Sequence, residues 1–168
     1  MSRWVFPLTV RRAVALGAAL LLAGRAPAPP AADDVGMLRA LHDKVIRAHR
    51  ESDVELLLED EPADSVIANR GEVTRPTLDE RRARLGGYLR ATTFREYRDL
   101  TDPVVRVSAD GTLGWVIVQV EAKGIRTTPD GAQEPIDFVS AWIELYEKRD
   151  GRWLRVGNVS NFKPPETP

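Results

Sequence analysis

Hydrophobic and polar side chains alternate along residues 137–162, which read DFVSAWIELYEKRDGRWLRVGNVSNF. Alternation with a period of two residues, together with many aromatic and β-branched side chains, predicts two long strands in this segment. The pair Asp150-Gly151 separates the two runs and predicts a two-residue hairpin loop, because glycine adopts positive φ at no steric cost. The preceding residues are expected to supply more strands beside this hairpin and helices that cover one of its faces.

The register of the hairpin decides which side chains share a face. A two-residue loop places Ile143 opposite Asn158 and Ala141 opposite Ser160. One face is then mostly apolar and ends in two polar residues: Val139, Ile143, Leu145, Leu154, Val156 and Phe162, with Asn158 and Ser160. The other face carries large aromatic and charged side chains: Trp142, Glu144, Tyr146, Trp153 and Arg155. A three-residue loop starting at Arg149 would instead put Asn158 opposite Trp142 and exchange the faces, so both registers remain open.

Helical spacing characterises three segments nearer the N-terminus. The first, 33–52, places its apolar residues and both histidines on one face: Leu38, Leu41, His42, Val45 and His49. A short helix is expected over 54–58. Thr77, followed three residues later by Glu80, forms a capping-box pattern and predicts a third helix that runs to about Arg90.

Strand patterns fill most of the remaining chain. Short strands are expected at 65–69 and 72–73, and strand material at 94–107 is interrupted near Asp102-Pro103. Residues 113–125 form a long strand that is apolar on both faces around Trp115, which predicts a central strand covered on both sides. Helices followed by a meander of strands indicate an α+β fold, in which a curved antiparallel sheet wraps around the N-terminal helices as a cone with an open mouth.

The first 32 residues differ from the rest. Arg3, Arg11 and Arg12 precede an uncharged run over 13–24, and a stretch rich in Ala and Pro follows. A basic start, a short apolar run and small residues after it predict a signal peptide and export to the periplasm or the medium. The organisation expected is therefore a signal segment at 1–32, one domain at 33–163 and a polar tail at 164–168.

Charge and cysteine usage narrow the functional classes. The chain has 24 basic residues, four of them before Asp33, and 25 acidic residues that all follow, so the exported part has a net charge of −5. With no block of basic residues, binding to nucleic acid or to anionic membranes is disfavoured. The absence of cysteine excludes disulfides and thiolate metal sites, and no cofactor or metal is expected.

With this order of helices and strands, the chain resembles the nuclear transport factor 2-like superfamily, in its SnoaL-like and ketosteroid isomerase-like branch. The resemblance covers about 38–162 and is carried by Asp53 with the following LLL, by SVIAN with Gly71-Glu72, by the helix from Thr77, and by KRDGRWLRV with Ser160. It implies a cone-shaped α+β barrel with an internal pocket and, often, a dimer through the outer face of the sheet. Many relatives carry histidines shortly after the turn tryptophan, where this chain has Gly157 and Val159.

Candidate site residues follow from these patterns. His42 and His49 point the same way from one helix but lie about 10 Å apart along its axis, so they cannot chelate one metal together. One of them could line a pocket as a base or hydrogen-bond donor. The residues expected to line the pocket are His49, Tyr88, Tyr97, Trp115, Ile143, Asn158 and Ser160. The residues expected on a dimer face are Trp142, Glu144, Tyr146 and Arg155. No catalytic residue is assigned.

Three functions are compatible with this sequence. The first is an exported, dimeric domain that binds a small, mostly apolar ligand in its pocket. The second is an isomerase or dehydratase that uses a tyrosine, Tyr88 or Tyr97, with a carboxylate, Glu121 or Asp137. The third is a protein–protein interaction module whose working surface is the sheet face that carries Trp142.

Overall fold

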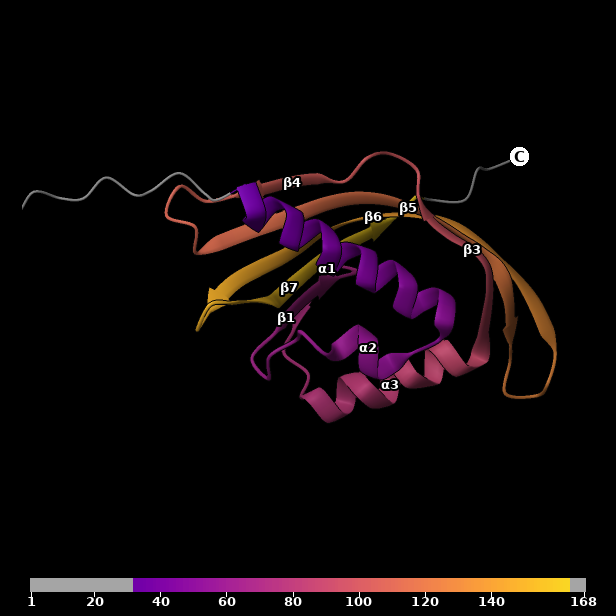
Figure 1. Cartoon of the computed structure of the whole chain (residues 1–168). Helices are drawn as coiled ribbons and strands as arrows, with labels where there is room; N and C mark the ends of the chain where they lie inside the picture. The colour runs from indigo at the N-terminus through magenta and orange to yellow at the C-terminus, as the bar shows by residue number, and fades with distance from the viewer. Residues whose placement is uncertain (1–31, 164–168) are drawn as a thin grey trace, which may run out of the picture.

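The computed structural model describes residues 32–163, so the predicted signal peptide and polar tail lie outside the described residues, apart from Ala32. Figure 1 shows a curved sheet that arches over α1, with α2 and α3 on the open side of the arch. The elements in chain order are α1 (Ala32–Glu51), α2 (Val54–Leu58), β1 (Val66–Asn69), β2 (Glu72–Thr74), α3 (Leu78–Ala91), β3 (Thr92–Asp99), β4 (Val104–Val107), β5 (Leu113–Thr127), β6 (Gln133–Arg149) and β7 (Arg152–Phe162).

The helices begin where the sequence predicts. Asp53 caps α2 by accepting a hydrogen bond from the Leu56 N–H, at 2.9 Å. Thr77 and Glu80 form the complete capping box at the start of α3. Within the described part of the chain, no helix is long and apolar enough to cross a membrane.

The sheet is mixed and does not close. Its strand order is β2-β1-β7-β6-β5-β3, and β4 also pairs with β5. The expectation of a purely antiparallel sheet is wrong at one pair, because β1 runs parallel to β7. The connection between the two strands explains the difference: β1 precedes α3 and the whole meander, so its direction is not set by a hairpin with β7. The α+β class and the wrapping of the sheet around the helices are as predicted.

A β-bulge at Val156 changes the register of the long hairpin. The two-residue loop is present, with Arg149 opposite Arg152 and positive φ at Asp150 and Gly151. The pairing shifts after Tyr146 and Arg155, so that Leu145 lies opposite Gly157 and Val156 is the extra residue. A bulge inserts one residue into one strand and moves every later side chain by one position.

Beyond the bulge, the predicted pairings are wrong. Asn158 lies opposite Glu144, and Ser160 lies opposite Trp142. Both polar residues therefore share the face of the aromatic and charged side chains rather than the apolar face.

The helices cover the face opposite to the one expected. Trp142, Tyr146 and Trp153 pack with Leu38 and Ile46 of α1 in the main core, together with the inward residues of β5: Val116, Val118, Val120 and Ala122. The face that was expected to be buried is partly open, with Leu145 39% exposed and Val159 44% exposed. Both faces carry large apolar residues, so alternation identifies which residues share a face but not which face the helices cover.

The central strand β5 is covered on one side only. Its even-numbered residues 116–122 are buried, whereas Ile117 on the other side is 40% exposed. The prediction of cover on both sides is therefore wrong for the single chain. On the side away from the helices, β4, β5, β6 and β7 form a largely apolar surface, here called the outer face. Its residues are Val104, Leu113, Trp115, Ile117, Ile143, Leu145 and Val159.

Candidate functional site

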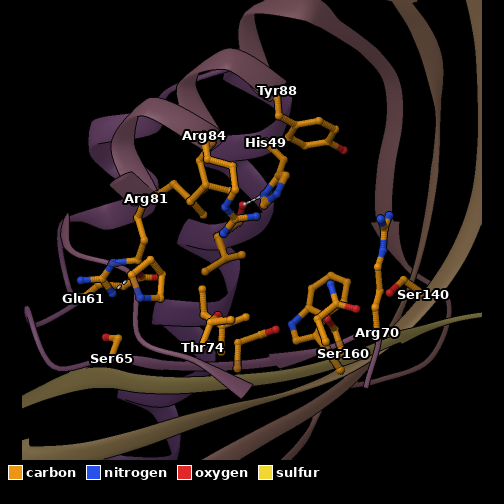
Figure 2. A pocket seen from close by; sticks show the side chains of 18 of the residues that line it. His49, Glu61, Ser65, Arg70, Thr74, Arg81, Arg84, Tyr88, Ser140 and Ser160 are labelled. Carbon is orange, nitrogen blue, oxygen red and sulfur yellow. Dashed lines mark hydrogen bonds and ion pairs between the residues drawn. The ribbon is translucent and has the colours of Figure 1, made fainter. Parts of the chain in front are cut away.

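A cavity of about 850 Å³ lies between the helices and the inner face of the sheet. Its walls come from every helix and from β1, β2, β3, β5, β6 and β7, so segments far apart in the sequence meet there. A second hydrophobic cluster, which joins α1, α2 and α3 through Val45, Leu57 and Leu89, supports the helical wall. Figure 2 shows the lining side chains that converge on this space.

Five of the seven residues predicted to line a pocket do line this cavity: His49, Tyr88, Tyr97, Asn158 and Ser160. Trp115 and Ile143 do not, because both belong to the outer face. Asn158 and Ser160 reach the cavity through the bulge at Val156, which carries them to the inner face.

The dimer-face prediction is wrong in its residues. Trp142, Glu144, Tyr146 and Arg155 are all buried on the inner face, and Trp142 and Arg155 line the cavity. Since α1 covers this face, these side chains cannot meet a second chain without unfolding the first. The hypothesis of a protein–protein interaction module is wrong about its surface for the same reason, because the sheet face that carries Trp142 is buried under the helices.

One wall of the cavity is aromatic and holds a histidine. The His49 ring stacks on Tyr97 with ring centroids 4.3 Å apart, and Phe94 packs edge-on against both rings. His49 Nδ1–H donates to the Val45 carbonyl at 2.8 Å, so Nε2 is left as an acceptor. Burial lowers the pKa of His49 to about 4, which keeps the ring neutral at neutral pH.

Two tyrosines complete this wall as hydrogen-bond donors. Burial raises the pKa of Tyr88 to about 12 and raises the pKa of Tyr97 well above its usual value. Both hydroxyls therefore keep their protons at physiological pH. Tyr88 also packs edge-on against Phe94 at 5.9 Å, which fixes its ring on the α3 side of the cavity.

The wall opposite is cationic. Glu61 accepts from Arg81 Nη1 at 2.9 Å through one oxygen and from Arg155 Nη2 at 2.5 Å through the other. The remaining bonds of the two guanidiniums go to backbone carbonyls, from Arg81 to Pro62 and from Arg155 to Leu57. Burial acts to lower the pKa of Arg155, but the charge of Glu61 raises it overall, so the guanidinium stays charged.

Three further arginines line the cavity, and all three are exposed. Arg126 on β5 is paired with Glu134 at 2.6 Å. Arg84 on α3 and Arg70 in the β1–β2 turn form no ion pair with any of residues 32–163. Arg84 projects from the α3 side beside His49, and Arg70 from the side of the β1–β2 turn (Figure 2).

A buried network that sequence reasoning missed lies behind the aromatic wall. Glu144 accepts from His42 Nδ1 at 3.0 Å, from Trp142 Nε1 at 2.8 Å and from the Tyr146 hydroxyl at 2.7 Å. Asp99 accepts a hydrogen bond from the other ring nitrogen of His42, Nε2, at 3.0 Å. The available signals were a histidine on the apolar face of α1 and a carboxylate between two aromatic residues of one strand face.

The ionisation of this network is set by its mutual hydrogen bonds. Burial lowers the pKa of His42, but the bonds to Asp99 and Glu144 outweigh it and raise that pKa to about 9. Burial raises the pKa of Glu144, but the bond and charge of His42 bring it down to about 2. His42 is therefore an imidazolium held between two carboxylates.

The carboxylates named for an isomerase do not line the cavity. Glu121 bonds to Arg98 and Lys123 away from the helices, and Asp137 is exposed. The prediction that Glu121 or Asp137 lies in the pocket with Tyr88 or Tyr97 is therefore wrong. Across residues 32–163, no group of three or more His, Asp or Glu side chains could hold a metal ion.

Comparisons with known proteins place the fold. No protein-family profile matches the chain, and no curated protein matches it by sequence. An uncharacterised protein with a cystatin-like fold from Caulobacter vibrioides has a TM-score of 0.62 at 20% identity, over 79% of this chain and 92% of that one. A ketosteroid isomerase-like protein from Erwinia carotovora has a TM-score of 0.61 at 15% identity, over 80% and 99%.

A third solved structure is a nuclear transport factor 2-like protein from Cytophaga hutchinsonii. It has a TM-score of 0.60 at 18% identity, over 76% of this chain and 97% of that one. The strand order, the helices on the concave face and these likenesses agree with the resemblance noted in the sequence. The chain therefore shares its fold with these cystatin-like-fold, ketosteroid isomerase-like and nuclear transport factor 2-like proteins.

Proposed function

We propose that this chain is an exported small-molecule-binding domain that holds its ligand in the cavity of about 850 Å³. The observation that carries the proposal is a cavity of ligand size whose walls combine apolar and aromatic side chains with a few convergent polar groups. Tyr88 and Tyr97 supply donors, and His49 supplies an acceptor. The basic and apolar N-terminal segment supports export.

Dimerisation is part of the same proposal, with its surface reassigned to the outer face. Leu113, Ile117, Leu145 and Val159 leave a contiguous apolar surface open on the convex side of the sheet. Exposed apolar surfaces of this kind mark contacts with other proteins, and a two-fold contact of the face with itself buries it in both chains.

Binding is favoured over proton-transfer catalysis. A general base works best when its pKa lies near the working pH. Burial holds the pKa of His49 at about 4, so its Nε2 is a weak base that stays unprotonated and can accept a hydrogen bond. Of the two glutamates that line the cavity, Glu61 binds two arginines through its two oxygens.

The test is native mass spectrometry of the chain from Asp33 onward, purified from an exporting host without denaturation. We expect a reproducible extra mass that organic solvent removes. Ser160→Trp, which places a large side chain in the cavity, should abolish or strongly reduce the extra mass, whereas Ala109→Trp on an exposed turn should retain it. A folded wild-type protein that carries no ligand and binds no apolar probe would overturn the proposal.

A further inference from the structure

We infer that the ligand is an amphipathic anion: one carboxylate, sulfonate or phosphate group on an apolar body, with the anion held by the arginines of the cavity. This inference rests on the proposed function and specifies its ligand class. It differs from the mostly apolar ligand expected from the sequence. The arginines that line the cavity are far apart in the chain, so their convergence is visible only in the fold.

The charge of the cavity is the first observation. Five arginines line it, Arg70, Arg81, Arg84, Arg126 and Arg155, against two glutamates, Glu61 and Glu72. The chain from Asp33 is acidic overall, so this gathering of positive charge runs against its general composition. A cleft with an excess of one sign of charge raises the local concentration of oppositely charged solutes.

The innermost charges are the second observation. Arg81 and Arg155 are 0% and 8% exposed, and both rely on the single carboxylate of Glu61. The charge of Glu144 also acts on Arg155, but Glu144 is hydrogen-bonded to His42, so within residues 32–163 no second carboxylate forms an ion pair with either arginine. Taking an ion out of water costs several kcal/mol unless an opposite charge compensates it. An anionic ligand would give these arginines a second ion-pair partner.

Unused donors are the third observation. Arg155 uses only Nη2 for both of its bonds, to Leu57 and Glu61, so Nε and Nη1 have no partner in the described part of the chain. Arg81 Nε is buried without a hydrogen-bond partner within the same residues. A guanidinium presents five donors that match the geometry of a carboxylate or phosphate.

Arg84 extends the cationic wall toward the aromatic one. It has no ion-pair partner within residues 32–163 and lies on the same stretch of α3 as Arg81 (Figure 2). Its guanidinium can bind an anion in the same cavity that Arg155 lines. An anion at this position would leave the rest of the ligand facing the aromatic wall.

The remaining walls require an apolar body. Leu85, Tyr97, Phe138 and Trp142 line the space beside the arginines, and the cavity is larger than a bare anion needs. Apolar area removed from water contributes roughly 25 cal/mol per Å², so a ligand with an aromatic or aliphatic body gains where inorganic phosphate does not. The two halves of the cavity therefore select for an amphipathic molecule.

The test compares two fluorescent probes that share one aromatic skeleton. Anilinonaphthalene sulfonate carries an anionic group, and N-phenylnaphthylamine does not. We expect the protein to bind the sulfonate at least tenfold more tightly at low salt, and this preference should shrink as salt increases. Octanoate should displace the sulfonate probe, whereas inorganic phosphate at the same concentration should not.

A matched pair of variants assigns the preference to the cavity. Arg84→Gln should lower the preference for the sulfonate over the neutral probe about tenfold, the loss of one charge-assisted hydrogen bond. Arg47→Gln, at an exposed site on α1 that does not line the cavity, should leave the preference unchanged. Arginine and glutamine have similar helix propensities, so neither substitution should alter the circular dichroism spectrum.

The outcomes separate this inference from the proposed function. Equal affinity for the two probes in the wild type, or an Arg84→Gln variant with an unchanged preference, would overturn the anion inference and leave the binding pocket standing. Displacement by inorganic phosphate as readily as by octanoate would overturn the requirement for an apolar body. Binding of neither probe by the folded protein would overturn the pocket and this inference with it.

Discussion

His42 and Glu144 are joined at 3.0 Å in the interior, although 102 positions separate them in the chain. Both side chains are fully buried, and Asp99 holds the second nitrogen of the same ring. This ion pair connects α1 to β6 in the interior of the protein, next to the cavity. It therefore links the stability of the fold to the shape of the candidate site.

Removing the charge of Glu144 should destabilise the protein strongly. In Glu144→Gln, His42 keeps only Asp99 as a counter-charge, and a broken buried ion pair costs about 3 kcal/mol or more. Urea denaturation followed by tryptophan fluorescence measures the change. Glu96→Gln, at an exposed pair with Arg98, should cost less than about 1 kcal/mol. Equal effects of the two variants would contradict a structural role for the buried pair.

Stability should fall at alkaline pH because of His42. Its pKa is raised to about 9 in the folded protein from 6.5, so its contribution is complete below pH 6.5 and is lost as the pH rises to 9. One proton over that interval corresponds to about 3 kcal/mol. Urea midpoints at the two pH values measure it. His42→Gln should be less stable at pH 6.5 and should lose much less stability between the two values; an unchanged alkaline loss would assign the effect to another group.

His49 should produce the opposite dependence at acidic pH. Its pKa is lowered to about 4 from 6.5, so its contribution is complete above pH 6.5 and is lost as the pH falls to 4. His49→Phe retains a ring for stacking on Tyr97 and cannot be protonated. We expect this variant to lose less stability than the wild type between pH 6.5 and 4, measured by the same urea titrations. A parallel loss in both proteins would refute a buried neutral histidine.

Two glycines should respond in opposite directions to alanine. A Cβ at Gly124 would overlap the carbonyl oxygen of Thr93 where β3 is bulged, so Gly124→Ala should cost about 2 kcal/mol or more through backbone displacement. A Cβ at Gly87 meets nothing within 4 Å, so Gly87→Ala should stabilise α3. The expected gain is about 0.5–1 kcal/mol. Thermal unfolding of both variants checks the two signs together.

A charge on the outer face should prevent assembly if this face forms the proposed dimer. Ile117→Glu places a carboxylate in the middle of the exposed apolar surface, and we expect a folded monomer by analytical ultracentrifugation. Val73→Glu, at a residue that is 70% exposed on β2, is the control and should remain dimeric. A dimeric Ile117→Glu would exclude this face, and a monomeric wild type would exclude the dimer.

Local chemistry in the sequence determined the elements of this protein. Asp53 and the Thr77–Glu80 box start two helices, because capping depends on residues three positions apart. Asp150-Gly151 turns the long hairpin, because both residues adopt positive φ. The apolar face of the first helix pointed to His49, and residue type as hydrogen-bond donors pointed to Tyr88 and Tyr97; all three line the cavity.

Tertiary structure alone decided the faces and the charge of the site. The bulge at Val156 has no signature in an alternating pattern, yet it carries Asn158 and Ser160 to the inner face. Which face the helices cover depends on packing against α1, since both faces carry large apolar side chains. The arginines of the cavity come from α3, β7, β5 and the β1–β2 turn, and the partner of His42 lies on β6. Such convergence has no local signal, because the folded chain alone brings distant residues within hydrogen-bond distance.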